Sequence, residues 1–213
     1  MITDPPEVNE QLRLTIFASF PEAMSRAQRH KELATLRGHR ARLRCMLLAP
    51  PRPAQLAAAA SMSAETPPML TLFTGGEDGD IRVWSLPDGK CVARLEGHTS
   101  WVNCFVLSDD GATLVSGSGD TTARVWDVST PGRSRCKHVL GPRGFDERGD
   151  EVQPGHEGWV LSVGLRGSML ATAGADTHVR LWDIRSGECL AVLEGASKGN
   201  LAVGIIPNPA TPE

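Results

Sequence analysis

Residues 116–127 read Ser-Gly-Ser-Gly-Asp-Thr-Thr-Ala-Arg-Val-Trp-Asp, and this stretch decides the fold because its pattern occurs three times. Residues 74–85 (Thr-Gly-Gly-Glu-Asp-Gly-Asp-Ile-Arg-Val-Trp-Ser) and 172–183 (Thr-Ala-Gly-Ala-Asp-Thr-His-Val-Arg-Leu-Trp-Asp) follow the same plan. In each copy a hydroxyl residue lies four positions before an Asp, and that Asp lies six positions before a Trp. An Arg always lies two positions before the Trp. Fixed spacing among otherwise different residues predicts repeated structural units.

The local composition of each copy indicates β-strands. Residues 81–84 alternate Ile and Val with Arg and Trp, the period of two expected for a strand with two different faces. Short apolar runs that end in Gly- and Asp-containing turns precede these residues, and Asp-Gly or Ser-Gly turns follow two of the copies. Each unit is therefore expected to hold four short antiparallel strands. The predicted strands are 69–74, 81–84, 90–95, 101–107, 112–116, 159–165, 169–172 and 188–193.

A Gly-His dipeptide precedes each copy, with its histidine at His39, His98 or His156. Units bracketed by Gly-His and Trp-Asp dipeptides resemble the WD-repeat family. The resemblance implies an all-β fold, a β-propeller of four-stranded antiparallel blades, in which the last strand of one blade precedes the Gly-His of the next repeat. Three full blades are then expected at about 41–95, 101–140 and 158–193, with the outer strand of an earlier blade at 33–37 and the inner strand of a later one at 200–206.

The chain is expected to divide into an N-terminal extension, the propeller blades and a disordered tail, at 1–32, 33–207 and 208–213. Within the extension, residues 12–17 are a candidate strand. Two insert loops are expected within the blades, an Ala- and Pro-rich segment at 49–68 and a Gly-rich, charged segment at 141–154.

Three blades predict an incomplete ring, because closed propellers have four to eight blades and an open ring leaves sheet edges unprotected. The expected explanation is that the sequence is a fragment of a larger propeller. Association with a second chain that completes the ring is the alternative.

Every unit contains His, Ser or Thr, Asp and Trp, which a search for hydrolases would take for a catalytic triad. A triad occurs once per active site, whereas this set occurs three times, and no helical pattern follows the Gly-Ser-Gly of residues 117–119. The family resemblance instead implies a buried structural network from the indole N–H through Ser or Thr and His to Asp. We therefore expect no enzymatic activity, with a hydrolase as the remote alternative. The network residues are His39, Thr74, Asp78, Trp84, His98, Ser116, Asp120, Trp126, His156, Thr172, Asp176 and Trp182.

The five cysteines predict neither a metal site nor a cofactor site. Cys45 and Cys104 both lie six positions after a Gly-His histidine, and Cys91 and Cys189 both lie seven positions after a blade Trp. Equivalent positions in different blades favour packing over one tetrahedral centre, and no pair has C-x-x-C spacing. Cys136 has no assigned role beyond a small packed thiol. The Gly-rich turns lack the Lys and the following helix of a phosphate-binding loop.

The resemblance places the partner-binding surface on the face that bears the Gly-His loops. Trp101 and Trp159 occupy the same position, three after each histidine, and Trp and Arg are enriched at interface hot spots. The alternative is that both Trp side chains pack against neighbouring blades. The sequence thus predicts a scaffold that binds other proteins or peptides. The candidate residues are Arg40, Arg42, Glu77, Thr99, Trp101, Glu157 and Trp159.

A second functional hypothesis comes from residues 182–185, Trp-Asp-Ile-Arg. They resemble the W-D-x-R pattern of propellers that serve as substrate receptors of cullin-RING ubiquitin ligases, which implies an adaptor contact through Asp183 and Arg185. Ala171 stands where that pattern usually has a larger apolar residue.

The bulk properties argue against two classes of partner, nucleic acid and membrane. A net charge of −3 gives no general attraction to nucleic acid, and no apolar stretch approaches the roughly 20 residues that span a bilayer. An odd number of cysteines without a secretory signal predicts an intracellular protein, in the cytoplasm or the nucleus.

Overall fold

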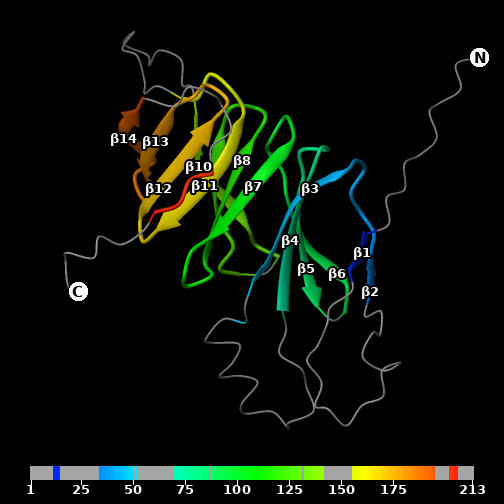
Figure 1. Ribbon diagram of the computed structural model, residues 1–213. Coiled ribbons are helices and arrows are strands. Elements are labelled where there is room, and N and C mark those ends of the chain that lie inside the picture. Colours follow the sequence, from blue (N-terminus) through cyan, green and yellow to red (C-terminus); the bar gives the residue numbers. More distant parts are fainter. Residues whose placement is uncertain are drawn as a thin grey trace, which may run out of the picture.

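The computed structural model describes residues 12–14, 34–49, 51, 70–86, 88–130, 132–141, 155–194 and 202–205. These residues form three four-stranded antiparallel sheets and one two-stranded sheet, with no helix among them. Figure 1 shows the three larger sheets side by side. The prediction of an all-β fold built from four-stranded blades is confirmed. No helix in the described part of the chain is long and apolar enough to cross a membrane.

Each blade is formed by four strands in chain order. Blade 1 comprises β3 (Leu43–Ala49), β4 (Leu70–Gly76), β5 (Ile81–Leu86) and β6 (Lys90–Leu95). Blade 2 comprises β7 (Val102–Leu107), β8 (Thr113–Ser118), β9 (Ala123–Asp127) and β10 (Arg135–Leu140). Blade 3 comprises β11 (Val160–Arg166), β12 (Met169–Gly174), β13 (Val179–Asp183) and β14 (Glu188–Leu193). The first strands of the blades adjoin one another, because β7 contacts both β3 and β11.

Several strands extend beyond their predicted limits. β4 and β8 continue two residues past the expected end and run into the Asp turn. β3 includes Ala49, which the sequence had placed in the first insert. Most of that insert and residues 142–154 of the second lie outside the described residues.

Both flanking segments lie against the outer blades. β1 (Leu12–Leu14) pairs antiparallel with β2 (Ala34–Leu36), so the strands expected near 12–17 and 33–37 pair with each other in a two-stranded sheet. Leu36 is buried in a cluster with Trp84 of blade 1. At the other end, residues 202–205 form no strand, contrary to the prediction for 200–206. They lie beside β11, where the Val203 amide donates to Ser162 Oγ at 3.0 Å.

The core lies between the blades and follows from the alternation along each strand. In β5, Ile81 and Val83 point toward blade 2, whereas Trp84 packs on the other side with Leu36. Trp126 of blade 2 faces blade 1 in the same way, and Trp182 of blade 3 faces blade 2. Burying such side chains contributes roughly 1.5–3 kcal/mol each before the entropy of folding is subtracted.

Blades approach closely at Gly117, and alanine there is expected to destabilise the protein. A Cβ atom at Gly117 would lie 2.6 Å from Val160 Cγ1 and 2.7 Å from Cys104 Sγ. Gly117→Ala should therefore lower the free energy of unfolding by about 1–3 kcal/mol through overpacking. Urea unfolding measures the effect. The control is Gly204→Ala, whose Cβ would meet nothing within 4 Å. Equal unfolding midpoints for the two variants would refute the close approach.

Candidate functional site: a buried network and an exposed tryptophan cluster

The predicted polar residues of blade 2 form one hydrogen-bonded chain. Trp126 Nε1 donates to Ser116 Oγ at 2.8 Å, and Ser116 Oγ lies 2.8 Å from His98 Nε2. His98 Nδ1 lies 2.8 Å from Asp120 Oδ2. Because the indole can only donate and a carboxylate can only accept, the hydroxyl donates to Nε2 and Nδ1–H donates to the carboxylate. Every polar atom along the chain thereby has a partner.

The same chain recurs in the other two blades. Thr74 Oγ1 lies 2.8 Å from both Trp84 Nε1 and His39 Nε2, and Thr172 Oγ1 lies 2.8 Å from its Trp and His partners. The histidines lie 2.9–3.0 Å from Asp78 and Asp176. In blade 3 the Asp176 carboxylate also accepts from Arg180 Nη1 at 2.7 Å. The structure thus brings the twelve predicted residues together in three sets of four.

Each Asp also fixes the loop that follows the Gly-His dipeptide. The backbone amides of Arg40, Thr99 and Glu157 donate to the Asp of their own blade at 2.9–3.1 Å. The side chains of these three residues remain exposed. The network therefore anchors the backbone of the Gly-His face and leaves its side chains to solvent.

The hydroxyl groups are unsuited to attack a substrate. Thr74, Ser116 and Thr172 are each 0% exposed, and each oxygen already accepts an indole N–H. A nucleophile needs access to the reacting atom, which this geometry denies. Among the described residues, no group of three or more His, Cys, Asp and Glu side chains could hold a metal ion.

Burial and hydrogen bonding set the charges in the network. Burial lowers the pKa of His98 and His156, which favours neutral imidazoles. Burial alone would raise the pKa of Asp120 and Asp176, but hydrogen bonds from the histidine and from a backbone amide outweigh it. The pKa of Asp176 is lowered to about 2, and that of Asp120 is also lowered. Neutral histidine and ionised aspartate are therefore the forms of the folded state.

Acidification is expected to destabilise the protein in two stages. The neutral histidines stabilise the fold fully above their unfolded pKa of about 6.5, and this stabilisation is lost as pH falls toward their lowered folded pKa. The ionised aspartates stabilise the fold fully above their unfolded pKa of about 3.9. This stabilisation is lost as pH falls below that value. Urea unfolding at pH 7.5, 6 and 5 should show a falling free energy of unfolding. Constant or rising stability over that range would contradict these charge assignments.

All five cysteines fall into two sets of repeat-equivalent positions. Cys91, Cys136 and Cys189 lie opposite the blade Trp on each outer strand. Sequence spacing missed Cys136 because the turn between β9 and β10 is longer than its counterparts. On the inner strands, burial raises the pKa of Cys45 well above its ordinary range and that of Cys104 to about 12. Such thiols remain protonated and unreactive.

Two tryptophans lie next to each other on the Gly-His face. Trp101 of blade 2 and Trp159 of blade 3 have ring centroids 5.7 Å apart at an interplanar angle of 51°. They are 37% and 50% exposed. Their carbonyls accept the amides of Gly119 and Ala175 at 2.8 Å, which fixes both backbones. The rings therefore pack across the boundary between blades and still present apolar surface to solvent.

Arg44 of blade 1 completes this surface. Its guanidinium carbon lies 4.8 Å from the centre of the Trp101 ring, within the range of a cation–π interaction. Arg44 Nη1 lies 3.6 Å from Glu77 Oε1, and Nη2 donates to Asn103 Oδ1 at 3.3 Å. Asn103 Nδ2 donates to the Val160 carbonyl at 3.1 Å. We call Arg44, Glu77, Trp101, Asn103 and Trp159 the tryptophan cluster.

The candidate residues predicted for this face did not include Arg44 and Asn103. Both lie five positions after a Gly-His histidine, two positions beyond those selected as candidates. This shared position was the available signal, but a β-bulge at Leu43/Cys45 and at Val102/Cys104 interrupts the regular alternation of side chains there. The candidate Arg42 is exposed at the position equivalent to the two tryptophans, and its carbonyl accepts the backbone amide of Glu77 of the cluster at 2.8 Å.

The predicted adaptor residues lie elsewhere. Asp183 ends β13, at the end of blade 3 opposite to the Asp turn and the Gly-His loop. The Arg185 amide donates to Asp183 Oδ1 at 2.9 Å, and the Arg185 side chain is exposed. Asp183 and Arg185 are thus close to each other and remote from the tryptophan cluster.

Repeated four-stranded sheets, each with a His–Ser/Thr–Asp–Trp network, define a WD-type β-propeller protein. The model of the WD domain, G-beta repeat, matches residues 30–85, 89–127 and 150–183, more than half of the chain. The chain belongs to this family, as its repeats predicted. Proteins of the family are generally non-catalytic interaction scaffolds.

Individual relatives match in part. The chain is 33% identical over 134 residues to nuclear distribution protein PAC1 of Arthroderma otae, which covers 58% of the chain and 29% of that protein. It is 28% identical over 144 residues to mitochondrial division protein 1 of Aspergillus oryzae. This match covers 60% of the chain and 22% of that protein. The chain thus spans less than a third of the length of these relatives.

Two solved structures share the fold. They are a structure of U3-55K and a crystal structure of RRP9 WD40 repeats, each with a TM-score of 0.58 and 19% identity. Each covers 79% of this chain, which in turn covers 44% and 43% of those chains. At this identity the likeness establishes the propeller fold alone.

Proposed function

We propose that the protein is a non-catalytic scaffold that binds a protein or peptide partner on its Gly-His face through the tryptophan cluster. The observation that supports this most directly is the contact between Trp101 and Trp159 while both rings stay exposed. Large aromatic side chains on a rigid surface are typical interface anchors.

The cluster is organised before any partner arrives. Glu77 and Asn103 hold Arg44, and the cation in turn lies against Trp101. Three blades contribute to this arrangement, so binding would cost little ordering of side chains. The preferred partner would place an apolar side chain against the exposed tryptophan rings.

Quantitative affinity capture tests the proposal. Proteins retained by the immobilised chain should be lost with the Trp101→Ala/Trp159→Ala double variant, which should keep the thermal unfolding midpoint. The control is Val92→Ala, an exposed apolar residue on β6 outside the cluster. An unchanged set of retained proteins in the double variant would refute the proposal.

The ubiquitin-ligase receptor is a second candidate function. One observation favours it: Arg185 is exposed at the end opposite to the tryptophan cluster, so an adaptor and a substrate could bind at different ends of the blades. Arg185→Ala should lose a cullin adaptor that the Arg133→Ala control retains. Failure of the wild-type chain to bind any adaptor would remove this candidate.

A further inference from the structure

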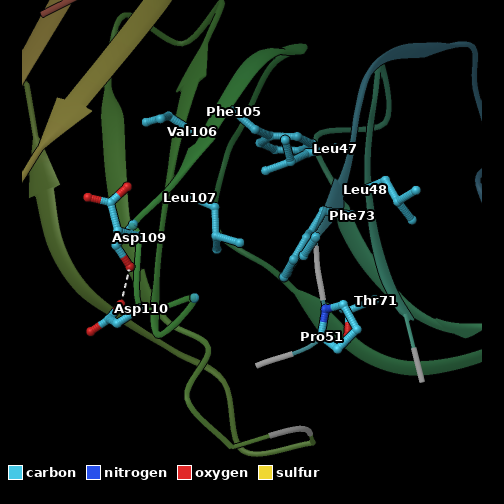
Figure 2. A pocket seen from close by; sticks show the side chains of 13 residues that line it. Leu47, Leu48, Pro51, Thr71, Phe73, Phe105, Val106, Leu107, Asp109 and Asp110 are labelled. Carbon is cyan, nitrogen blue, oxygen red and sulfur yellow. Dashed lines mark hydrogen bonds between the residues drawn. The ribbon is translucent and has the colours of Figure 1, made fainter. Parts of the chain in front are cut away.

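The two ends of the blades offer a partner different surfaces. At the end opposite to the Gly-His face, a cleft of about 430 Å³ lies between β3 and β7, and Figure 2 shows Leu47, Phe73 and Phe105 in its walls. All three belong to the core between blades 1 and 2. These side chains are already engaged in the contact between blades, whereas the Gly-His face carries exposed aromatic and charged side chains.

Arg42 continues the row of exposed tryptophans into blade 1. It lies three positions after its Gly-His histidine, as Trp101 and Trp159 do. In all three blades the carbonyl at this position accepts the amide of the residue before the turn Asp, each time at 2.8 Å. The three side chains therefore start from equivalent points of their blades, and all three residues are exposed. The Gly-His face thus presents a cation at blade 1 and an apolar ring at each of blades 2 and 3.

The charge of this face changes from one blade to the next. One position after the histidine stand Arg40, Thr99 and Glu157, and the Asp of each blade holds their backbone amides in the same way. Their exposed side chains place a positive charge at blade 1, none at blade 2 and a negative charge at blade 3. Arg37, in the same loop as Arg40, adds another exposed cation at blade 1.

The positive charges of blade 1 are not equally neutralised. Arg44 lies 3.6 Å from Glu77 Oε1 and against the Trp101 ring. Within the described part of the chain, by contrast, no carboxylate forms an ion pair with Arg40 or Arg42. Their guanidinium groups are therefore available to carboxylates of a bound partner, for which the fork of donors on Arg is well suited.

We infer that the segment bound by the tryptophan cluster is an acidic peptide, with Asp or Glu beside a large apolar residue. The apolar side chain would lie on Trp101 and Trp159, and the neighbouring carboxylates would meet Arg40 and Arg42. This inference rests on the proposed function, because the same two rings anchor the peptide. Charge complementarity selects an acidic peptide over a basic one, since like charges brought together weaken a complex.

The charge distribution also favours a peptide over single-stranded nucleic acid, the other ligand that Arg and Trp side chains can bind together. A nucleic acid strand carries a phosphate at every nucleotide, so a strand that followed the row of blades would bring phosphates to Glu157. A peptide can confine its negative charge to the blade 1 side.

A displayed library of random heptapeptides, selected on the immobilised full chain, tests the inference. Recovered peptides, synthesised and titrated, should carry Asp or Glu next to a large apolar residue. Arg40→Glu/Arg42→Glu should weaken their binding at least tenfold, and high salt should weaken binding to the wild-type chain. Selection on this charge-reversed variant should instead recover peptides with Lys or Arg beside the apolar residue.

The repeats show that the charge-reversed variant is compatible with the fold. Glu157 stands at the position of Arg40 in blade 3, and the backbone hydrogen bond of Arg42 does not depend on its side chain. The matched control is Arg133→Glu/Arg185→Glu, which makes the same change of charge at exposed positions remote from the Gly-His face. It should leave peptide binding unchanged.

Three results would overturn the inference. They are the recovery of no peptide or of peptides without acidic residues, an equal loss of binding in the control variant, and tighter binding of a single-stranded oligonucleotide than of any recovered peptide. Trp101→Ala/Trp159→Ala separates this inference from the proposed function. If uncharged peptides bind and need the two tryptophans, only the charge preference fails, whereas acidic peptides that bind without the tryptophans refute the proposed function.

Discussion

Replacement of Ser116 by alanine is expected to lower the free energy of unfolding by about 2–4 kcal/mol, the sum of two buried polar groups left without partners. Ser116 Oγ accepts from Trp126 Nε1 and pairs with His98 Nε2, each at 2.8 Å. All three residues are buried, so water cannot replace the hydroxyl without a rearrangement of the core. Urea unfolding followed by tryptophan fluorescence measures the loss.

The other blades supply the control for this change. Thr74 and Thr172 occupy the position of Ser116 and make the same two hydrogen bonds. Ser116→Thr should therefore lower the free energy of unfolding by less than about 1 kcal/mol, because only one methyl group must be accommodated. If the alanine and threonine variants were equally stable, the hydrogen-bonded network would not be a source of stability.

Removal of Trp159 should weaken the partner complex by about 2 kcal/mol, or roughly 30-fold in Kd, the magnitude of an interface hot spot. Trp159 is the more exposed of the two rings and contacts Trp101. Trp159→Ala thus removes both contact area and the support of its neighbour. Isothermal titration with a partner identified by affinity capture provides the Kd.

The double variant tests whether the two rings act together. Because the rings touch, the loss of binding free energy in Trp101→Ala/Trp159→Ala should not equal the sum of the losses in the two single variants. The difference should exceed about 0.5 kcal/mol. Val92→Ala should leave Kd unchanged. Strict additivity, or an equal loss with Val92→Ala, would mean that the rings do not form a single binding surface.

The blade architecture was predictable because the repeats carry redundant information. The recurring Gly of Gly-His has a physical cause, since a Cβ at Gly97 would lie 2.5 Å from Arg124 Nη1 and 3.4 Å from Trp126. The recurring Arg and Trp thus fill the space that glycine leaves. Spacing therefore predicts the repeated units, and the family resemblance that rests on this spacing implies the propeller fold and each set of network residues.

The tryptophan cluster was less predictable than the blades, because it depends on contacts between residues of different blades. Arg44 meets Trp101 only when blade 1 packs beside blade 2, and no repeat pattern contains that pair. Residues 202–205 show the same limit, because the blade order implied by the family resemblance predicted a strand where the described chain has none.

Site-specific photo-cross-linking tests the central claim, that the partner binds on the Gly-His face. A photoreactive phenylalanine at Thr99 lies two residues from Trp101 on that face, and one at Arg133 lies in the turn between β9 and β10 at the opposite end. The account predicts a covalent adduct with the captured partner from position 99 and none from 133, and loss of the adduct in Trp101→Ala/Trp159→Ala. An adduct from position 133 alone, or one from position 99 that survives removal of both tryptophans, would contradict it.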